Sequence, residues 1–97
     1  MSVSLSTHVL DTAAGRPAAG VRVELFAQEE RLAVAETAED GRIEELATGL
    51  TPGRYRLVFR PPSPFFVRVE LEVELGDGHH HVPLVVSPYG CASYRGS

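Results

Sequence analysis

The sequence predicts an all-β fold, a β-sandwich of seven to eight antiparallel strands. Apolar residues recur mainly at every second position, and clusters of Gly, Pro, Asp and Ser separate the short apolar runs. Apolar residues at helical spacing are rare. With 97 residues, 43% of them hydrophobic, the chain can build one small core, so we expect a single domain over residues 1–97.

Four strands are expected in the first half of the chain. The first covers residues 3–10 and the second residues 21–25, with a turn over residues 11–20 between them. A third over residues 32–37 stops before the Asp40-Gly41 turn signal, and a fourth covers residues 42–46. Alternation in the first strand separates two sets of side chains: Val3, Leu5, Thr7 and Val9 inward, and Ser4, Ser6 and His8 outward.

Four more strands are expected in the second half. Residues 54–59 follow the Thr51-Pro52-Gly53 turn, and prolines at positions 61, 62 and 64 stop this strand because proline cannot donate to a ladder. The clearest alternation runs over residues 65–75, where apolar residues alternate with Arg and Glu. The segment 76–78 turns the chain into a strand over residues 79–86, and a short last strand covers residues 92–95.

Charge and composition exclude several classes of partner. The net charge is −4, every basic residue is Arg, and the basic residues form no run, so nucleic acid and anionic membranes are poor partners. The first residues lack the basic start and apolar stretch of a signal peptide, which favours the cytoplasm. Cys91 is the only cysteine, which precludes an internal disulfide, so a domain this small is expected to gain stability from a metal or from self-association.

The histidines are the candidate chemical groups. Because His80 shares a face with Val82, Leu84 and Val86, His79 and His81 must lie on the other face, and His8 likewise points away from the core. A strand pairing could bring His8 and His81 together. Two imidazoles and an arginine suit hydrolysis, since imidazole accepts a proton near neutral pH and guanidinium holds a developing oxyanion.

Simpler interpretations stand beside this one. His8 could be a solvated surface histidine, Arg42 could close a hairpin, and Tyr94 could pack at a subunit contact. Adjacent strand residues point to opposite faces, so at most two histidines of the run at 79–81 could share an ion, and we predict no metal. Cys91 has no neighbouring base in sequence, so a nucleophilic role is not expected.

Three segments carry a resemblance to a known family: Ser6-Thr7-His8-Val9-Leu10-Asp11 near the start, His79-His80-His81-Val82-Pro83-Leu84, and Ser93-Tyr94-Arg95-Gly96-Ser97 at the end. Between them lie Gly15-Arg16-Pro17, Asp40-Gly41-Arg42-Ile43, Pro52-Gly53-Arg54-Tyr55 and Ser87-Pro88-Tyr89-Gly90, all in the family's order. Over nearly its whole length the chain resembles the 5-hydroxyisourate hydrolase family, which has the transthyretin-like sandwich fold.

The resemblance implies a cytoplasmic homotetramer, with active sites in the cleft where two dimers meet and with no cofactor. It implies catalytic roles for His8, Arg42 and His81, and substrate contacts from His8, Arg42, Tyr94, Arg95 and Ser97. A histidine would activate water for attack on a ring carbonyl of 5-hydroxyisourate, while Arg42 would orient the substrate and stabilise charge. The product would be 2-oxo-4-hydroxy-4-carboxy-5-ureidoimidazoline. Which histidine is the base is left open.

The chain departs from the family pattern in two places. Only residues 60–64 connect the strands on either side, which predicts that the short helix of transthyretin-like folds is lost. Cys91-Ala92-Ser93 replaces what is commonly an aromatic residue followed by Ser-Thr. Two alternative functions stay open: a small-ligand-binding protein on the same transthyretin-like scaffold, and, if the shortened loop marks a divergent member, a hydrolase of another cyclic ureide.

Overall fold

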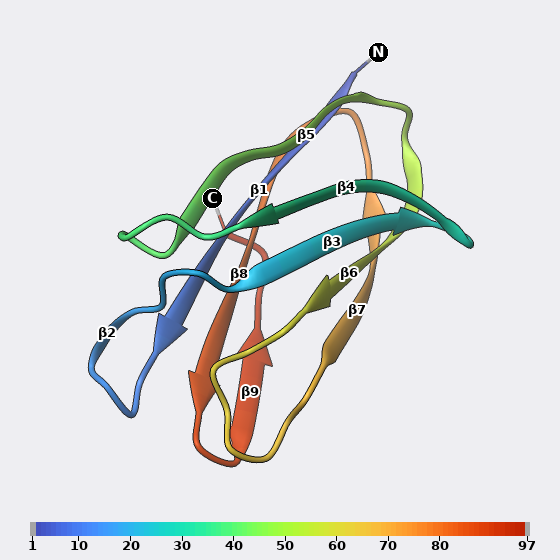
Figure 1. Cartoon of the computed structure of the whole chain (residues 1–97). Helices are drawn as coiled ribbons and strands as arrows, with labels where there is room; N and C mark the ends of the chain where they lie inside the picture. The colour runs from blue at the N-terminus through green and yellow to red at the C-terminus, as the bar shows by residue number, and fades with distance from the viewer. Residues whose placement is uncertain (1, 97) are drawn as a thin grey trace.

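The computed structural model describes residues 2–96, which form nine strands in two facing sheets and contain no helix (Figure 1). The strands are β1 (Val3–Asp11), β2 (Arg16–Pro17), β3 (Arg22–Ala27), β4 (Glu30–Glu36), β5 (Arg42–Leu50), β6 (Gly53–Phe59), β7 (Val69–Leu75), β8 (Gly78–Ser87) and β9 (Gly90–Ser93). The predicted all-β sandwich is confirmed, and so is the loss of the helix. No helix among these residues has the length and apolar character needed to cross a membrane.

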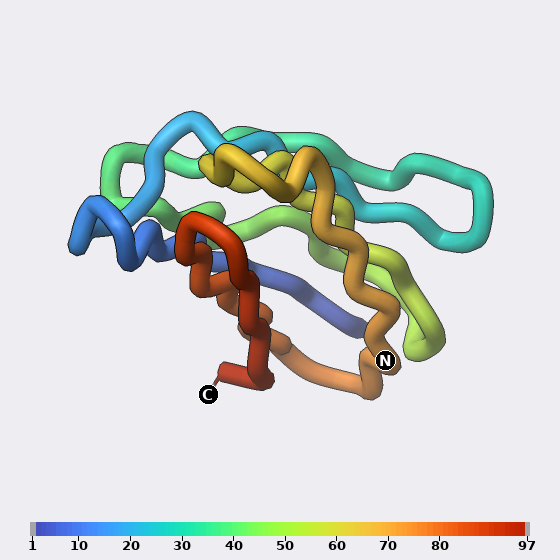
Figure 2. Tube along the Cα trace, turned by 90° about the horizontal axis from the view of Figure 1, so that it is seen from below, coloured from blue at the N-terminus to red at the C-terminus, as the bar shows by residue number. Residues whose placement is uncertain are grey.

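The two sheets are stacked as layers with the core between them (Figure 2). Sheet A has the order β2-β1-β8-β9, with β5 also paired to β1, and sheet B has the order β4-β3-β6-β7. Inward side chains of both sheets form one apolar cluster, whose most deeply buried members are Val3, Leu5, Val9, Val23, Leu25, Leu57 and Phe59. Burying each such side chain contributes about 1.5–3 kcal/mol relative to leaving it in water.

β1 lies in the middle of sheet A. Its partner on one side is β5, which runs antiparallel, and its partner on the other side is β8, which runs parallel over nine paired residues. The prediction of antiparallel pairing throughout was therefore wrong for this pair. The reason is topological: the chain returns to sheet A after β7 of sheet B, and alternation within a strand carries no information about the direction of its neighbour.

β7 is shorter than predicted. The strand expected over residues 65–75 begins only at Val69, and Phe65 and Val67 are exposed. β6 ends at Phe59, which pairs with Val69, so the preceding residues have no partner strand. Instead, the Ser63 hydroxyl accepts the backbone N–H groups of Phe65 and Phe66 and donates to the carbonyl of Pro88, which ties this segment to the turn between β8 and β9.

Other strand boundaries also differ from the predictions. β5 continues to Leu50, with shifts in its register against β1. Two residues of the expected turn over residues 11–20 form the short strand β2, which raises the number of strands among the described residues to nine. β9 covers residues 90–93 instead of 92–95. The chain leaves β8 after Ser93 and returns to it at a single bridge between Gly96 and His81, so the last described residues lie beside β8 without continuing the ladder.

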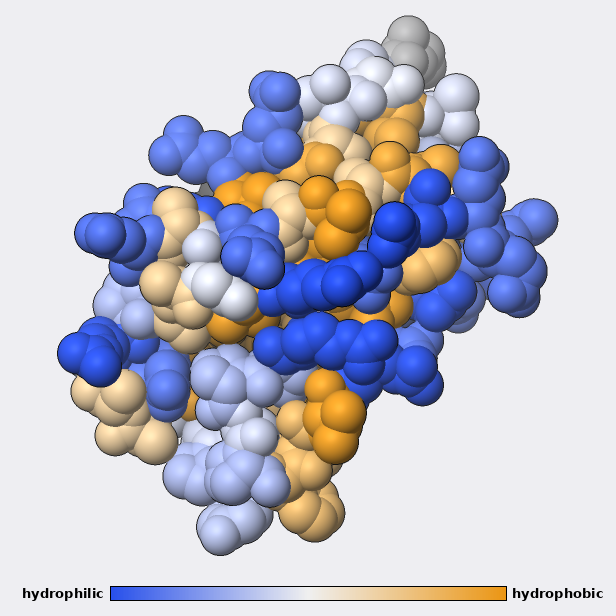
Figure 3. Space-filling model, viewed as in Figure 1, coloured by the Kyte–Doolittle hydropathy of each residue, from blue (hydrophilic) through white to orange (hydrophobic). Residues whose placement is uncertain are grey.

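Paired charges cover the outer face of sheet B. Glu24 accepts hydrogen bonds from Arg22 at 3.4 Å and Arg31 at 3.1 Å, and the Arg31 hydrogen bond is the main cause that lowers the pKa of Glu24. Arg56 binds Glu70 at 3.0 Å and lies 4.5 Å from the centre of the Phe26 ring. Figure 3 shows long hydrophilic side chains lying across this side of the molecule, next to apolar atoms.

Candidate active site

The candidate site lies on the outer face of sheet A, where β5, β1 and β8 are neighbours. His8 of β1 is paired with Arg42 of β5, and Ser6 of β1 is paired with His81 of β8. Val82, Leu84 and Val86 are buried on the other face of β8. The alternation predicts this arrangement, and the pairing of β1 with β8 brings His8 and His81 onto neighbouring strands.

A tight turn brings Arg42 to His8. Gly41 has a φ of 78°, and a Cβ there would lie 2.5 Å from the carbonyl oxygen of Val9 and 2.8 Å from Cβ of Pro17. The carbonyl of Gly41 accepts the N–H of Val9 at 2.8 Å, which docks the turn on β1. Asp40 accepts the N–H of Arg42 through Oδ1 at 3.0 Å. Glycine is therefore needed where the hairpin leads into Arg42.

The hydrogen bond of His8 determines its tautomer. Nε2 of His8 lies 2.9 Å from the carbonyl oxygen of Asp40. Because a carbonyl can only accept, Nε2 carries the hydrogen and donates it. In neutral His8 the lone pair is therefore on Nδ1, the nitrogen that remains available to accept a proton.

His81 is held at both its ring and its backbone. Nδ1 lies 2.8 Å from the Ser6 hydroxyl oxygen, and the His81 carbonyl accepts the N–H of Gly96 at 2.7 Å. Partial burial is the main cause that lowers the pKa of His81, and the positive charges of Arg42, His8 and His79 add to it. The lowered pKa favours neutral His81 at pH 7, and Nε2 can accept a proton when Nδ1 donates to Ser6.

Gly96 lies against the His81 ring. A Cβ at this position would come within 2.6 Å of Cδ2 and 3.2 Å of Cγ of His81. A side chain there would push the imidazole or the tail away. The tail therefore positions His81 through a residue that has no side chain.

A cavity of about 410 Å³ is lined by Ser6, Thr7, Arg42, Glu44 and His81, whereas His8 is not among its lining residues. This volume suits a small heterocycle. A neutral imidazole can take a proton from water here, and the Arg42 guanidinium can stabilise an oxyanion. Residues 2–96 hold no group of three His, Cys, Asp or Glu side chains arranged to bind a metal ion. Burial raises the pKa of Cys91, which makes its thiolate scarce at neutral pH.

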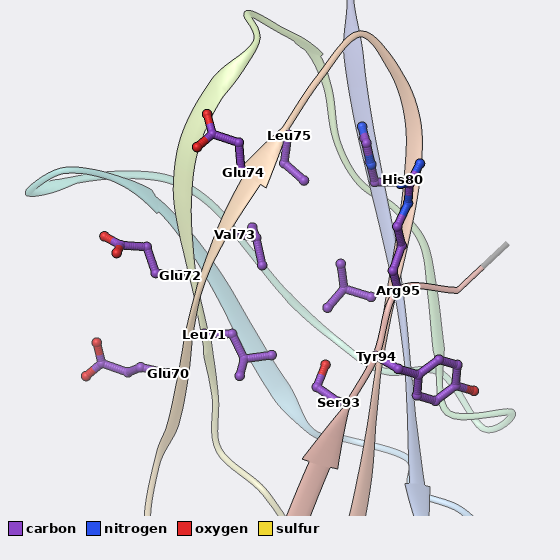
Figure 4. A pocket seen from close by; sticks show the side chains of 11 residues that line it. Glu70, Leu71, Glu72, Val73, Glu74, Leu75, His80, Ser93, Tyr94 and Arg95 are labelled. Carbon is purple, nitrogen blue, oxygen red and sulfur yellow. The ribbon is translucent and has the colours of Figure 1, made fainter.

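The tail residues line a different hollow within the single chain. Tyr94 and Arg95 border a groove of about 430 Å³ between β7 and the strands β8 and β9, together with His80 (Figure 4). In Figure 4, Leu71, Val73 and Leu75 point into this groove, whereas the Tyr94 ring points away from β7. Tyr94 is 58% exposed. Ser97, the remaining predicted substrate contact, lies outside the described residues.

Comparison with known proteins identifies the family. The sequence pattern of the HIUase/Transthyretin family matches residues 5–96. The chain belongs to this family. One relative, 5-hydroxyisourate hydrolase 2 of Rhizobium meliloti strain 1021, is 38% identical over 114 residues, which cover 96% of this chain and 95% of the relative.

Solved structures of the HIUase/Transthyretin family agree with this assignment. The structure of Klebsiella pneumoniae 5-hydroxyisourate hydrolase superposes with a TM-score of 0.90 at 36% identity, covering 98% of this chain and 99% of the other. Sea bream transthyretin in complex with thyroxine superposes with a TM-score of 0.83 at 24% identity, covering 95% and 93%. The second comparison shows the shared fold alone.

Sequence reasoning assigned no role to four polar residues near this family member's cavity. Ser4, Ser6 and His79 form hydrogen bonds that lead to His81, and Glu44 lines the cavity beside Arg42. A signal for the first three was present, because alternation places Ser4, Ser6 and His8 on one face and His79 with His81 on one face. Their connection depends on the register between β1 and β8.

Proposed function

We propose that this chain hydrolyses 5-hydroxyisourate to 2-oxo-4-hydroxy-4-carboxy-5-ureidoimidazoline without a cofactor. The observation that carries the proposal is the cavity that Arg42 and His81 line on the outer face of sheet A, next to which the strand register pairs His8 with Arg42. The names of the Rhizobium meliloti and Klebsiella pneumoniae relatives support the choice of substrate.

In the proposed reaction, a neutral imidazole takes a proton from water as the water oxygen attacks a ring carbonyl carbon. The carbon–nitrogen bond of that carbonyl then breaks, and the ring nitrogen receives the proton that the imidazole took from water. The carbonyl carbon stays in the product as a carboxyl group, which releases its remaining proton to solvent and becomes a carboxylate. Arg42 orients the anionic heterocycle and stabilises the charge that grows on the carbonyl oxygen. Two nitrogens can serve as the base, Nδ1 of His8 and Nε2 of His81, since each is left without a hydrogen-bond partner among the described residues.

A homotetramer is part of the proposal. β7 and β9 end the two sheets, so their outer edges have unpaired backbone groups within residues 2–96. The half-buried Leu71 and Val73 face the groove between these edges. Association of copies would cover them, and it offers a route by which Tyr94, Arg95 and Ser97 could reach substrate. Light scattering should give a mass four times that of one chain, and a monomer at working concentrations would contradict this part.

A cytoplasmic location is also proposed. The lone Cys91 supports it, because reducing compartments leave thiols unpaired. Cell fractionation of the native source should recover the protein with cytoplasmic markers, and recovery outside the cytoplasm would contradict the proposal.

The direct test is the ultraviolet decay of freshly generated 5-hydroxyisourate. Purified protein should accelerate the decay in proportion to its concentration, and a rate equal to the spontaneous one would reject the assignment. Other cyclic ureides should be run in parallel, because preference for one of them would indicate a hydrolase of different specificity.

Carriage of a small apolar ligand is the second candidate. The groove of about 430 Å³ with Leu71, Val73 and Leu75 on one wall is the observation that favours it. A carrier would bind an aromatic ligand in a calorimetric titration and would leave the decay of 5-hydroxyisourate unchanged.

A further inference from the structure

We propose that Ser6 is a positioning residue that joins His81 to His79 in a proton relay, so that the positive charge of the reaction resides on His79. The inference rests on the proposed function and adds a path for the proton. Ser4, His79, Ser6 and His81 form one continuous chain of hydrogen bonds on the outer face of sheet A.

The distances leave no gap in this chain. The Ser4 hydroxyl oxygen lies 2.7 Å from Nδ1 of His79, and the Ser6 hydroxyl oxygen lies 2.9 Å from Nε2 of the same ring. The Ser6 oxygen also lies 2.8 Å from Nδ1 of His81. Both nitrogens of His79 and one nitrogen of His81 are therefore engaged by serine hydroxyls.

The register between β1 and β8 produces this arrangement. In the parallel pair, Ser4 is aligned with His79 and Ser6 with His81. Side chains two residues apart share a face, so the two serines and the two imidazoles form two facing columns. If β8 slipped by one residue against β1, His79 and His81 would point into the core. The relay therefore depends on the register that the buried residues enforce.

A hydroxyl has one hydrogen, so when Ser6 donates to one imidazole and accepts from the other, the chain runs in one of two directions. In the first, His81 donates from Nδ1 to Ser6, Ser6 donates to Nε2 of His79, and His79 donates from Nδ1 to Ser4. Nε2 of His81 is then a bare lone pair, which is a base. In the second, every bond is reversed, and Nε2 of His81 carries a hydrogen, which is an acid. Both arrangements are neutral and fully hydrogen-bonded.

The proton balance follows from the first arrangement. As Nε2 of His81 takes a proton from water, its Nδ1 proton passes to Ser6, and the Ser6 proton passes to Nε2 of His79. His81 ends neutral, Ser6 ends unchanged, and His79 becomes an imidazolium. When Nε2 of His81 then protonates the departing ring nitrogen, the two protons move back and the chain returns to its starting state.

Electrostatics favour this location of the charge. The ionisable groups that face His81 are His8 on β1, Arg42 and Glu44 on β5, and His79 on β8 itself. Partial burial and Arg42 both disfavour an imidazolium at His81 and lower its pKa. His79 is exposed to water, which solvates an imidazolium there. The relay therefore removes from His81 the charge that its surroundings disfavour.

Replacement of Ser6 tests the relay. Ser6→Ala should lower kcat about tenfold or more with KM unchanged, a part of the ~10²–10⁴-fold that a positioned acid or base contributes. Ser6→Thr keeps the hydroxyl and should restore most of the rate. Thr12→Val is the matched control, because Thr12 directly follows β1 and also hydrogen-bonds to β8, donating to the carbonyl of Val86, but its hydroxyl has no hydrogen bond to an imidazole. It should leave kcat unchanged.

Two further measurements separate a relay from a merely structural hydroxyl. In mixtures of H2O and D2O, the dependence of wild-type kcat on the deuterium fraction should indicate that several protons move together. The same dependence in Ser6→Ala should indicate that a single proton moves. The exposed His79 is open to replacement without loss of fold, so His79→Gln should lower kcat comparably, and the double variant should be no worse than either single one.

The outcomes are distinct. An active wild type whose kcat is unaffected by Ser6→Ala, or a Ser6→Thr variant as impaired as Ser6→Ala, overturns the relay and leaves the proposed function standing. A single-proton dependence in the wild type, or additive losses in the double variant, also overturns it. A wild type that does not accelerate the decay overturns the proposed function and the relay together.

Discussion

The outer faces of the two sheets have the same alternating polar pattern but differ in how their charges are neutralised. On sheet B, Glu24 lies between two arginines, and Arg54 and Arg56 each bind a glutamate across neighbouring strands. On sheet A, Arg42 forms no salt bridge within residues 2–96, and the polar neighbours of the imidazoles are serine hydroxyls and a backbone carbonyl.

This difference distinguishes a structural surface from a chemical one. Paired charges on sheet B satisfy one another and cover the apolar atoms beneath them. On sheet A the guanidinium and the imidazoles stay available to a ligand, and hydrogen bonds orient the rings without neutralising Arg42. Alternation alone describes both faces equally, so the pairing of charges is the informative feature.

The largest expected effect comes from removing an imidazole of sheet A. His81→Ala and His8→Ala should each lower kcat/KM for 5-hydroxyisourate by about 10²-fold or more, because each removes a candidate base. Both side chains point away from the core, so circular dichroism should show an unchanged fold. A variant that retains the wild-type decay rate would remove that histidine from the mechanism.

Changing the guanidinium of sheet A should have a similar or slightly smaller effect. Arg42→Lys keeps the positive charge but loses the planar fork of donors, and kcat/KM should fall about 10²-fold. The same decay assay measures it. Arg54→Lys on sheet B is the matched control and should behave as the wild type; equal losses in the two variants would refute the contrast between the faces.

A methyl group on the tail tests how closely His81 must be positioned. Gly96→Ala places a carbon within 2.6 Å of the His81 ring and should lower kcat about tenfold, less than the ~10²-fold that a full 1 Å misplacement can cost. Gly53→Ala, where a Cβ meets nothing within 4 Å, serves as the control. Undiminished activity in Gly96→Ala would indicate that the tail does not position the ring.

The lowered pKa of His81 has a measurable consequence for pH dependence. Activity should fall on the acid side with a midpoint below 6.5, the ordinary histidine value, because His81 must be neutral to accept a proton. Stability should follow the same direction. As pH falls below about 6.5, His81 takes up a proton in the unfolded chain before it does so in the folded chain. The contribution of His81 to the free energy of unfolding is therefore present above that pH and is lost as pH falls through its folded pKa.

Chemical denaturation across pH 4–8 measures the second effect. Replacing His81 with Gln should make the free energy of unfolding less dependent on pH. An unchanged pH dependence in this variant would show that another group causes it.

The smallest effect is expected on sheet B. Arg54 and Glu74 form an ion pair at 3.0 Å, but their side chains are 75% and 70% exposed. Water and salt screen such a pair, so Arg54→Ala should leave the decay rate and the melting temperature close to those of the wild type. A marked loss of activity would extend the site to the opposite face of the molecule.

The candidate site could be predicted in part. Alternation correctly separated His8 and His81 from the core, and the resemblance pointed to Arg42 and the tail. Local signals could not reveal that Ser6 bridges two imidazoles, because its partners are more than seventy residues away. Within one chain Tyr94 and Arg95 border the groove beside β7, so their proposed contact with substrate remains a prediction that depends on assembly.

The sequence by itself determined which face each strand buries, because a period of two allows only one assignment of apolar and polar sides. It also determined where most turns fall, through Gly, Pro and Asp. Only the tertiary structure decided that β1 and β8 run parallel, that β7 begins at Val69, and that Gly96 meets His81. Strand partners and strand ends depend on hydrogen bonds between distant segments, and no short window of sequence contains both partners.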